Sequence, residues 1–78
     1  MKIYIFKSGT TTMGYILEVE PANTILEVKE KLEALTNIPV DQVRLVFNSR
    51  SLDDERMLCD YNIMRKSSLA MSLKLRGD

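Results

Sequence analysis

The chain is poor in the side chains that catalysis and covalent cross-linking use. Its 78 residues include no histidine, no tryptophan and a single cysteine, Cys59. One thiol cannot form an internal disulfide, and without histidine or a second thiol a structural zinc site has too few ligands. The Cys–His and Ser–His pairs of nucleophilic catalysis lack their base. We therefore expect a non-enzymatic protein without metal or cofactor, in a reducing compartment such as the cytoplasm or nucleus.

The sequence also has no excess charge of either sign and no long apolar run. Eleven Lys and Arg residues balance eleven Asp and Glu residues, so no net field gathers nucleic acid or an anionic membrane at the surface. No stretch reaches the roughly 18 apolar residues of a membrane span, and the opening residues alternate instead of forming a signal peptide. We expect one soluble, monomeric domain over residues 1–78 with a flexible tail from about 74–78, which binds neither nucleic acid nor membrane.

Alternating apolar and polar residues predict strands. Met1, Ile3 and Ile5 share one face of a first strand, which a polar, glycine-containing turn joins to a second strand at residues 15–19. Further strands are predicted at residues 43–47, around 51–52 and at 68–75, the last with Leu69, Met71 and Leu73 on one face. A turn or two of helix is expected at residues 57–61.

A helix of about 12 residues is predicted after Thr24, because Thr24-Ile25-Leu26-Glu27 forms a capping box. Asn37 can adopt the left-handed conformation that ends helices, and Pro39 prevents continuation. The helix should place an apolar stripe on the core and its charged residues in solvent. The stripe comprises Ile25, Val28, Leu32 and Leu35, and the charged set comprises Glu27, Lys29, Glu30, Lys31 and Glu33.

The order of these elements predicts an α+β fold with two layers, because one helix can cover only one face of a sheet. If the first strand pairs with the last to shield its edge, the result is the β-grasp arrangement. That fold is a mixed sheet of four to five strands with one main helix packed on one face.

Segments along the whole chain resemble the ubiquitin family. The matching segments are residues 17–21, 24–25 with 28–29, 38–39 with 41–42, 44–47, 52–54, 58 with 60–63, and 73–77. The resemblance implies a ubiquitin-like β-grasp domain without an active site. Its members are labels or docking modules, so the implied partners are proteins with ubiquitin- or ubiquitin-like-binding domains, including proteasome receptors.

The resemblance also implies an apolar recognition patch on the outward face of the sheet, centred on Val46. Where ubiquitin has further apolar or histidine side chains, this chain has approximately Ser8, Ala70 and Ser72, so we expect a shallower and more polar patch. Phe6 beside Ala70 could rebuild it with a different shape. The expected patch residues are Val46, Arg44, Phe6, Ala70, Ser72, Arg50 and Lys74. The alternatives are that Val46 is an isolated surface valine and that Phe6 only packs within the hairpin, which is two residues longer than that of ubiquitin.

The C-terminal residues bear on conjugation. Conjugated members of the family end in Gly-Gly, whereas this sequence ends in Arg76-Gly77-Asp78. An aspartate adds a side chain and a charge at the reacting carbon, where glycine permits close approach. We therefore expect a non-covalent interaction module that conjugates poorly with this C-terminus. The alternative is a divergent covalent modifier, attached through a processed or altered glycine tail.

Some amines of the domain could accept another modifier when a chain of modifiers is built. Arginines stand where ubiquitin has two of its chain-building lysines, and a guanidinium cannot be acylated in their place. The remaining candidate acceptor groups are Lys29, Lys31, Lys66 and the amine of Met1. Cys59 is interpreted as a small, half-buried filler, with a catalytic thiol as the minor alternative. The run Asp53-Asp54-Glu55 lacks the spacing of a calcium loop and is interpreted as a solvated acidic loop.

Overall fold

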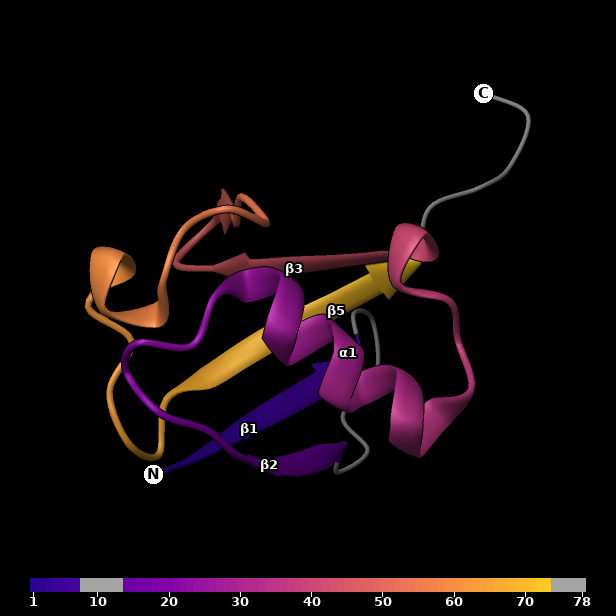
Figure 1. Ribbon diagram of the computed structural model, residues 1–78, viewed down its shortest axis with the longest axis horizontal. Helices are drawn as coiled ribbons and strands as arrows, with labels where there is room; N and C mark the ends of the chain where they lie inside the picture. The colour runs from indigo at the N-terminus through magenta and orange to yellow at the C-terminus, as the bar shows by residue number, and fades with distance from the viewer. Residues whose placement is uncertain (8–13, 74–78) are drawn as a thin grey trace.

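The computed structural model describes residues 1–7 and 14–73, and it confirms a two-layer β-grasp fold (Figure 1). One main helix, α1, lies across one face of a five-stranded mixed sheet. The strands are β1 (Lys2–Lys7), β2 (Tyr15–Glu18), β3 (Val43–Phe47), β4 (Arg50–Ser51) and β5 (Ser68–Leu73). The helices are α1 (Ile25–Thr36) and two short 3₁₀ helices, η1 (Val40–Gln42) and η2 (Leu58–Tyr61). The expected hairpin tip, including Ser8, and the tail lie outside the described residues.

The strand order is β2-β1-β5-β3-β4, so the first and last strands of the chain lie side by side in the middle of the sheet. They pair in parallel, with Ile5 opposite Leu69, whereas β1 with β2 and β3 with β5 pair antiparallel. This pairing removes the free edge that β1 would otherwise expose. The predicted pairing of the first and last strands is therefore confirmed.

The core lies between the helix and the inner face of the sheet. Alternate residues of the strands point into it, as the two-residue period predicts, and α1 contributes Ile25, Val28 and Leu32. The buried strand residues are Ile3, Ile5, Leu17, Val43, Leu45, Leu69 and Met71. Leu73, expected on the same face, is 47% exposed at the end of β5.

Two expectations about α1 are wrong. Leu35, assigned to the apolar stripe, is 55% exposed, because α1 crosses the strands at an angle and its last turn lies beyond the centre of the sheet (Figure 1). Lys29, assigned to solvent, is only 4% exposed. Its side chain lies under the segment that follows β4, so tertiary packing decides its environment and helical periodicity does not.

Both ends of α1 are formed as the sequence predicts. The Thr24 N–H donates to Glu27 Oε1 at 2.8 Å and the Glu27 N–H donates to Thr24 Oγ1 at 3.2 Å, which completes the capping box. Asn37 ends the helix with φ of 61°. No helix within the described residues is long and apolar enough to cross a membrane.

Candidate functional site

The outer face of the sheet, which α1 leaves uncovered, carries the expected patch. The strand register places Phe6 opposite Ala70 and Ala70 opposite Val46, so these three side chains form one row across β1, β5 and β3. Their sequence neighbours Ile5, Leu69 and Leu45 point into the core, and alternation therefore turns the row to the other side. Val46 is half-buried and is not part of the core cluster.

A second row of apolar side chains extends this surface toward β2. Tyr4 lies opposite both Ile16 on β2 and Ser68 on β5. Ile16 is 53% exposed and Tyr4 is half-buried. Reasoning from the sequence missed both residues, although the alternation of the first two strands already assigned them to the outer face. We call the side chains of Tyr4, Phe6, Ile16, Val46 and Ala70 the outer-face band.

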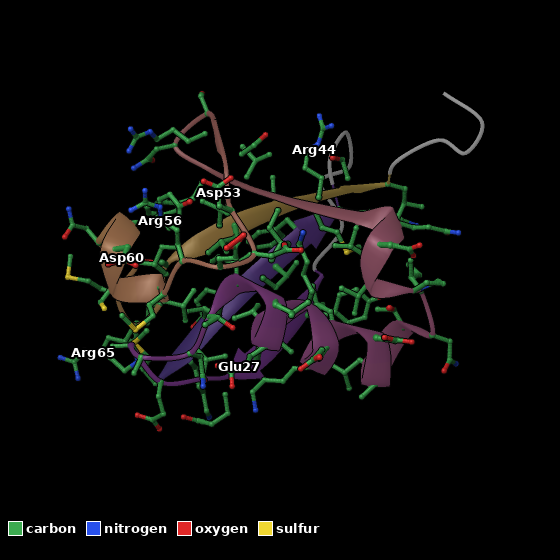
Figure 2. The ribbon with its side chains drawn as sticks, turned by 45° about the horizontal axis from the view of Figure 1, so that its top comes forward. Glu27, Arg44, Asp53, Arg56, Asp60 and Arg65 are labelled. Carbon is green, nitrogen blue, oxygen red and sulfur yellow. The ribbon has the colours of Figure 1, made fainter. Side chains whose placement is uncertain are left out.

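Arg44 flanks the outer-face band on β3, where it is exposed opposite Ser72. Arg50 on β4 was expected beside it, but its cross-strand partner is Phe47, which packs against the core. The register therefore turns Arg50, although exposed, away from the outer face. Figure 2 shows Arg44 pointing away from α1, whereas Glu27 lies on the opposite side of the molecule. Lys74, also expected here, lies outside the described residues, as do Arg76, Gly77 and Asp78.

The candidate acceptor groups differ in accessibility. The Lys29 ammonium lies 2.6 Å from Asp54 Oδ1, and its side chain is 5% exposed. Lys31 and Lys66 are exposed. The Met1 amine donates to Glu18 Oε2 at 2.8 Å and to the Val19 carbonyl at 2.7 Å. The amine was expected to be free, but these two hydrogen bonds occupy it. Of the proposed acceptors, Lys31 and Lys66 are the accessible ones.

Two carboxylates carry shifted pKa values. The hydrogen bond and charge of the N-terminal amine hold the pKa of Glu18 below its ordinary value of 4.5. The hydrogen bond from the Thr24 backbone N–H likewise lowers the pKa of Glu27. Both shifts have structural causes, a paired chain end and a helix cap, and neither produces an acid or base suited to catalysis.

Among the described residues, no cluster of three or more His, Cys, Asp or Glu side chains is arranged to hold a metal ion. Asp53, Asp54 and Glu55 are exposed, as expected of a solvated loop. Cys59 is exposed in η2, so its interpretation as a half-buried filler is wrong.

The sheet order, the single helix and the uncovered outer face define a ubiquitin-like β-grasp domain, which is a non-enzymatic fold. The chain belongs to the Ubiquitin family, whose model matches residues 5–76. This match confirms the resemblance along the chain.

Curated relatives of two kinds are similar to the chain. It is 34% identical over 73 residues to AN1-type zinc finger protein 4 of Mus musculus, covering 94% of this chain but 10% of that protein. It is 33% identical over 61 residues to ubiquitin-like protein NEDD8 of Dictyostelium discoideum, covering 78% of this chain and 79% of the relative. Ubiquitin-like protein 4A of Xenopus laevis is 38% identical over 58 residues, which are 74% of this chain and 39% of the relative. The matched region is thus a tenth of the zinc finger protein but most of the NEDD8 relative.

Proposed function

We propose that this domain is a non-covalent interaction module, recognised through its outer-face band by proteins that carry ubiquitin- or ubiquitin-like-binding domains, including receptors of the proteasome pathway. The observation that carries the proposal is the row of Phe6, Ala70 and Val46 on a sheet face that no other described element covers. Apolar side chains on an uncovered sheet face are typical of recognition sites. Proteins of this pathway act in the cytoplasm and nucleus, where we propose that the domain works as a monomer.

The chemistry of the surface defines the kind of partner that fits. Two aromatic rings on β1 supply apolar contact area, whereas β5 supplies only the small side chains of Ser68, Ala70 and Ser72. Large rigid aromatic side chains are the residues that most often dominate binding energy. Arg44 beside the band favours a partner with an acidic group next to an apolar ridge, because complementary charge raises the association rate and fixes orientation.

The test compares Val46→Ala and Phe6→Ala with Leu35→Ala. Leu35 is the matched control because it is an apolar side chain, 55% exposed, on the opposite layer of the fold. Purified ubiquitin-binding domains and a proteasome ubiquitin receptor serve as probes, with affinity measured by calorimetry. We expect Val46→Ala to cost about 1 kcal/mol or more of binding, roughly fivefold in Kd, with little change in stability. Phe6→Ala should cost more, because it removes a larger ring.

Unchanged affinity for both patch variants, or an equal loss for Leu35→Ala, would contradict the proposal. Chemical-shift mapping adds a second measurement. Perturbed amide signals should follow β1, β5 and β3 instead of α1.

The second candidate function is a divergent covalent modifier. Its support is size, since the chain covers 79% of the Dictyostelium discoideum relative, as expected of a free-standing ubiquitin-like protein. The assay is formation of an ATP-dependent thioester with ubiquitin-family activating enzymes, for the chain as it stands and for Asp78→Gly. Absence of any adduct with both chains would exclude this function, whereas an adduct with Asp78→Gly alone would locate the obstacle at the aspartate side chain.

A further inference from the structure

The side chains of the outer-face band follow a diagonal across the sheet. The band has Ile16 on β2, Tyr4 and Phe6 on β1, Ala70 on β5 and Val46 on β3. These four strands are consecutive neighbours in the sheet (Figure 1). Because neighbouring strands lie about 4.8 Å apart, the band extends about 14 Å from Ile16 to Val46, across the strands and not along them.

The band is two residues wide on β1. Tyr4 and Phe6 are two positions apart, which corresponds to about 7 Å along the strand. Tyr4 is in register with Ile16, whereas Phe6 is in register with Ala70, so each aromatic ring belongs to a different half of the band. Ile16 is 53% exposed and Val46 is half-buried. The half on β2 therefore offers a partner more accessible apolar surface at Ile16 than the other half offers at Val46.

Polar side chains limit the band on both sides. On one side Lys2 lies opposite Glu18, and the Glu18 carboxylate already accepts from the N-terminal amine at 2.8 Å. On the other side Arg44 lies opposite Ser72. Within the described ranges no carboxylate forms an ion pair with the Arg44 guanidinium. An unpaired positive charge is therefore present beside Val46, at one end of the band.

We infer that the partner segment bound by this band is an amphipathic α-helix that crosses the strands from β2 to β3, with Ile16 and Tyr4 as a second anchor point besides Val46. This inference rests on the proposed recognition function and names the element that the partner supplies. A helix with its side chains is about 10 Å wide, which matches two rows of the sheet, and about 14 Å of its length is between two and three turns. An extended segment presents one row of side chains and would cover only half of the width.

The band also specifies the side chains that this helix carries. Apolar residues at positions i, i+4 and i+7 or i+8 form one face of a helix and extend over about 11 to 12 Å. The first of them contacts Ile16 and Tyr4, the second contacts Phe6, and the third contacts Val46. An acidic residue on the flank near the third position pairs with Arg44 and fixes which end of the helix lies on β3.

The experiment measures the binding of single-helix and non-helical ubiquitin-binding domains to the parent chain and to Ile16→Thr by calorimetry. Threonine is β-branched like isoleucine, so it suits the strand while it removes most of the apolar contact. Leu73→Thr is the matched control, because Leu73 is 47% exposed at the end of β5 and shares the inner face of the sheet with Met71. Amide NMR spectra check that each variant is folded. A spin label at either end of a bound single-helix domain then reports the direction of the helix.

We expect the single-helix domains to bind the parent chain and Ile16→Thr to weaken this binding about fivefold. Leu73→Thr should bind like the parent chain. One spin label should broaden the amide signals of β2, and the label at the other end should broaden those of β3. Three results would each overturn the inference: binding by the non-helical domains alone, equal affinity of Ile16→Thr and the parent, or labels that broaden opposite ends of the same strands.

These results are distinguishable from a failure of the proposed function. If Val46→Ala weakens binding while Ile16→Thr does not, the recognition function stands and the helix across β2 is refuted. If none of the domains binds the parent chain, the proposed function is contradicted and this inference with it.

Discussion

The ion pair between the buried Lys29 and the half-exposed Asp54 offers a sharp test of how the segment after β4 is held on the helix. The Lys29 side chain is 5% exposed, whereas that of Asp54 is 46% exposed, with 2.6 Å between Nζ and Oδ1. Backbone hydrogen bonds reinforce the junction, since the Leu26 N–H donates to the Asp54 carbonyl at 3.1 Å. The ammonium is therefore the buried member of the pair, and the carboxylate is the member that water reaches.

The two single variants should differ strongly because of this asymmetry. Asp54→Asn leaves an ammonium buried without its counter-charge, which in a fully buried pair costs about 3 to 5 kcal/mol. Water at the exposed carboxylate side reduces the penalty, so we expect about 2 to 3 kcal/mol. Lys29→Met removes the buried charge and keeps an apolar side chain of similar length, so the free energy of unfolding should change by less than about 1 kcal/mol. When Asp54→Asn is added to Lys29→Met, the free energy of unfolding should fall by only about 0.5 kcal/mol relative to Lys29→Met alone, because no buried charge is left without a partner.

Urea unfolding followed by far-ultraviolet circular dichroism measures these differences, since the chain has no tryptophan for fluorescence. With an m value of about 1 kcal/mol/M for a domain of this size, Asp54→Asn should lower the midpoint by about 2 to 3 M urea. A domain of this length has only about 4 to 12 kcal/mol in total, so the shift will be large. The reasoning is refuted if Lys29→Met costs as much as Asp54→Asn, or if the double variant is no better than Asp54→Asn alone.

Three further predictions concern local structure. Gly14→Ala should destabilise the fold by about 3 kcal/mol in the same unfolding assay. The reason is that an added Cβ would overlap the carbonyl oxygen of Ile5 on the neighbouring strand. A urea midpoint equal to that of the parent chain would contradict this contact. Thr24→Ala should cost about 1 kcal/mol through loss of the helix cap, with Thr24→Ser as a control that keeps the hydroxyl. Stability should fall as the pH drops through and below 4.5, because the folded-state pKa values of Glu18 and Glu27 are lowered and the unfolded chain therefore binds more protons in acid. Glu27→Gln should make this fall shallower, and an unchanged slope between pH 5 and 3 would argue against the assignment.

Predictions from the sequence were correct where a feature depends only on residues close by in the chain. The capping box at Thr24, the left-handed cap at Asn37 and the alternation of β1 depend on neighbours within four residues, and all were predicted correctly. Lys29 and Leu35 share the same helical pattern as residues predicted correctly, yet both were assigned to the wrong environment. Periodicity specifies which side of a helix a residue occupies, but not how far the neighbouring layer extends beneath it.

The sequence by itself determined the elements and the two-layer class, and it predicted the non-enzymatic domain that the family match shows. It also identified Val46 and Phe6 as outward-facing, because alternation is a property of each strand alone. The family resemblance already predicted Phe6 beside Ala70 in a patch centred on Val46. Only the tertiary structure gave the register that aligns these three residues in one row, and only it decided that Tyr4 and Ile16 extend the patch and that Arg50 lies outside it. These groupings join residues distant along the chain, and strand register and loop closure, which no local pattern encodes, place them together.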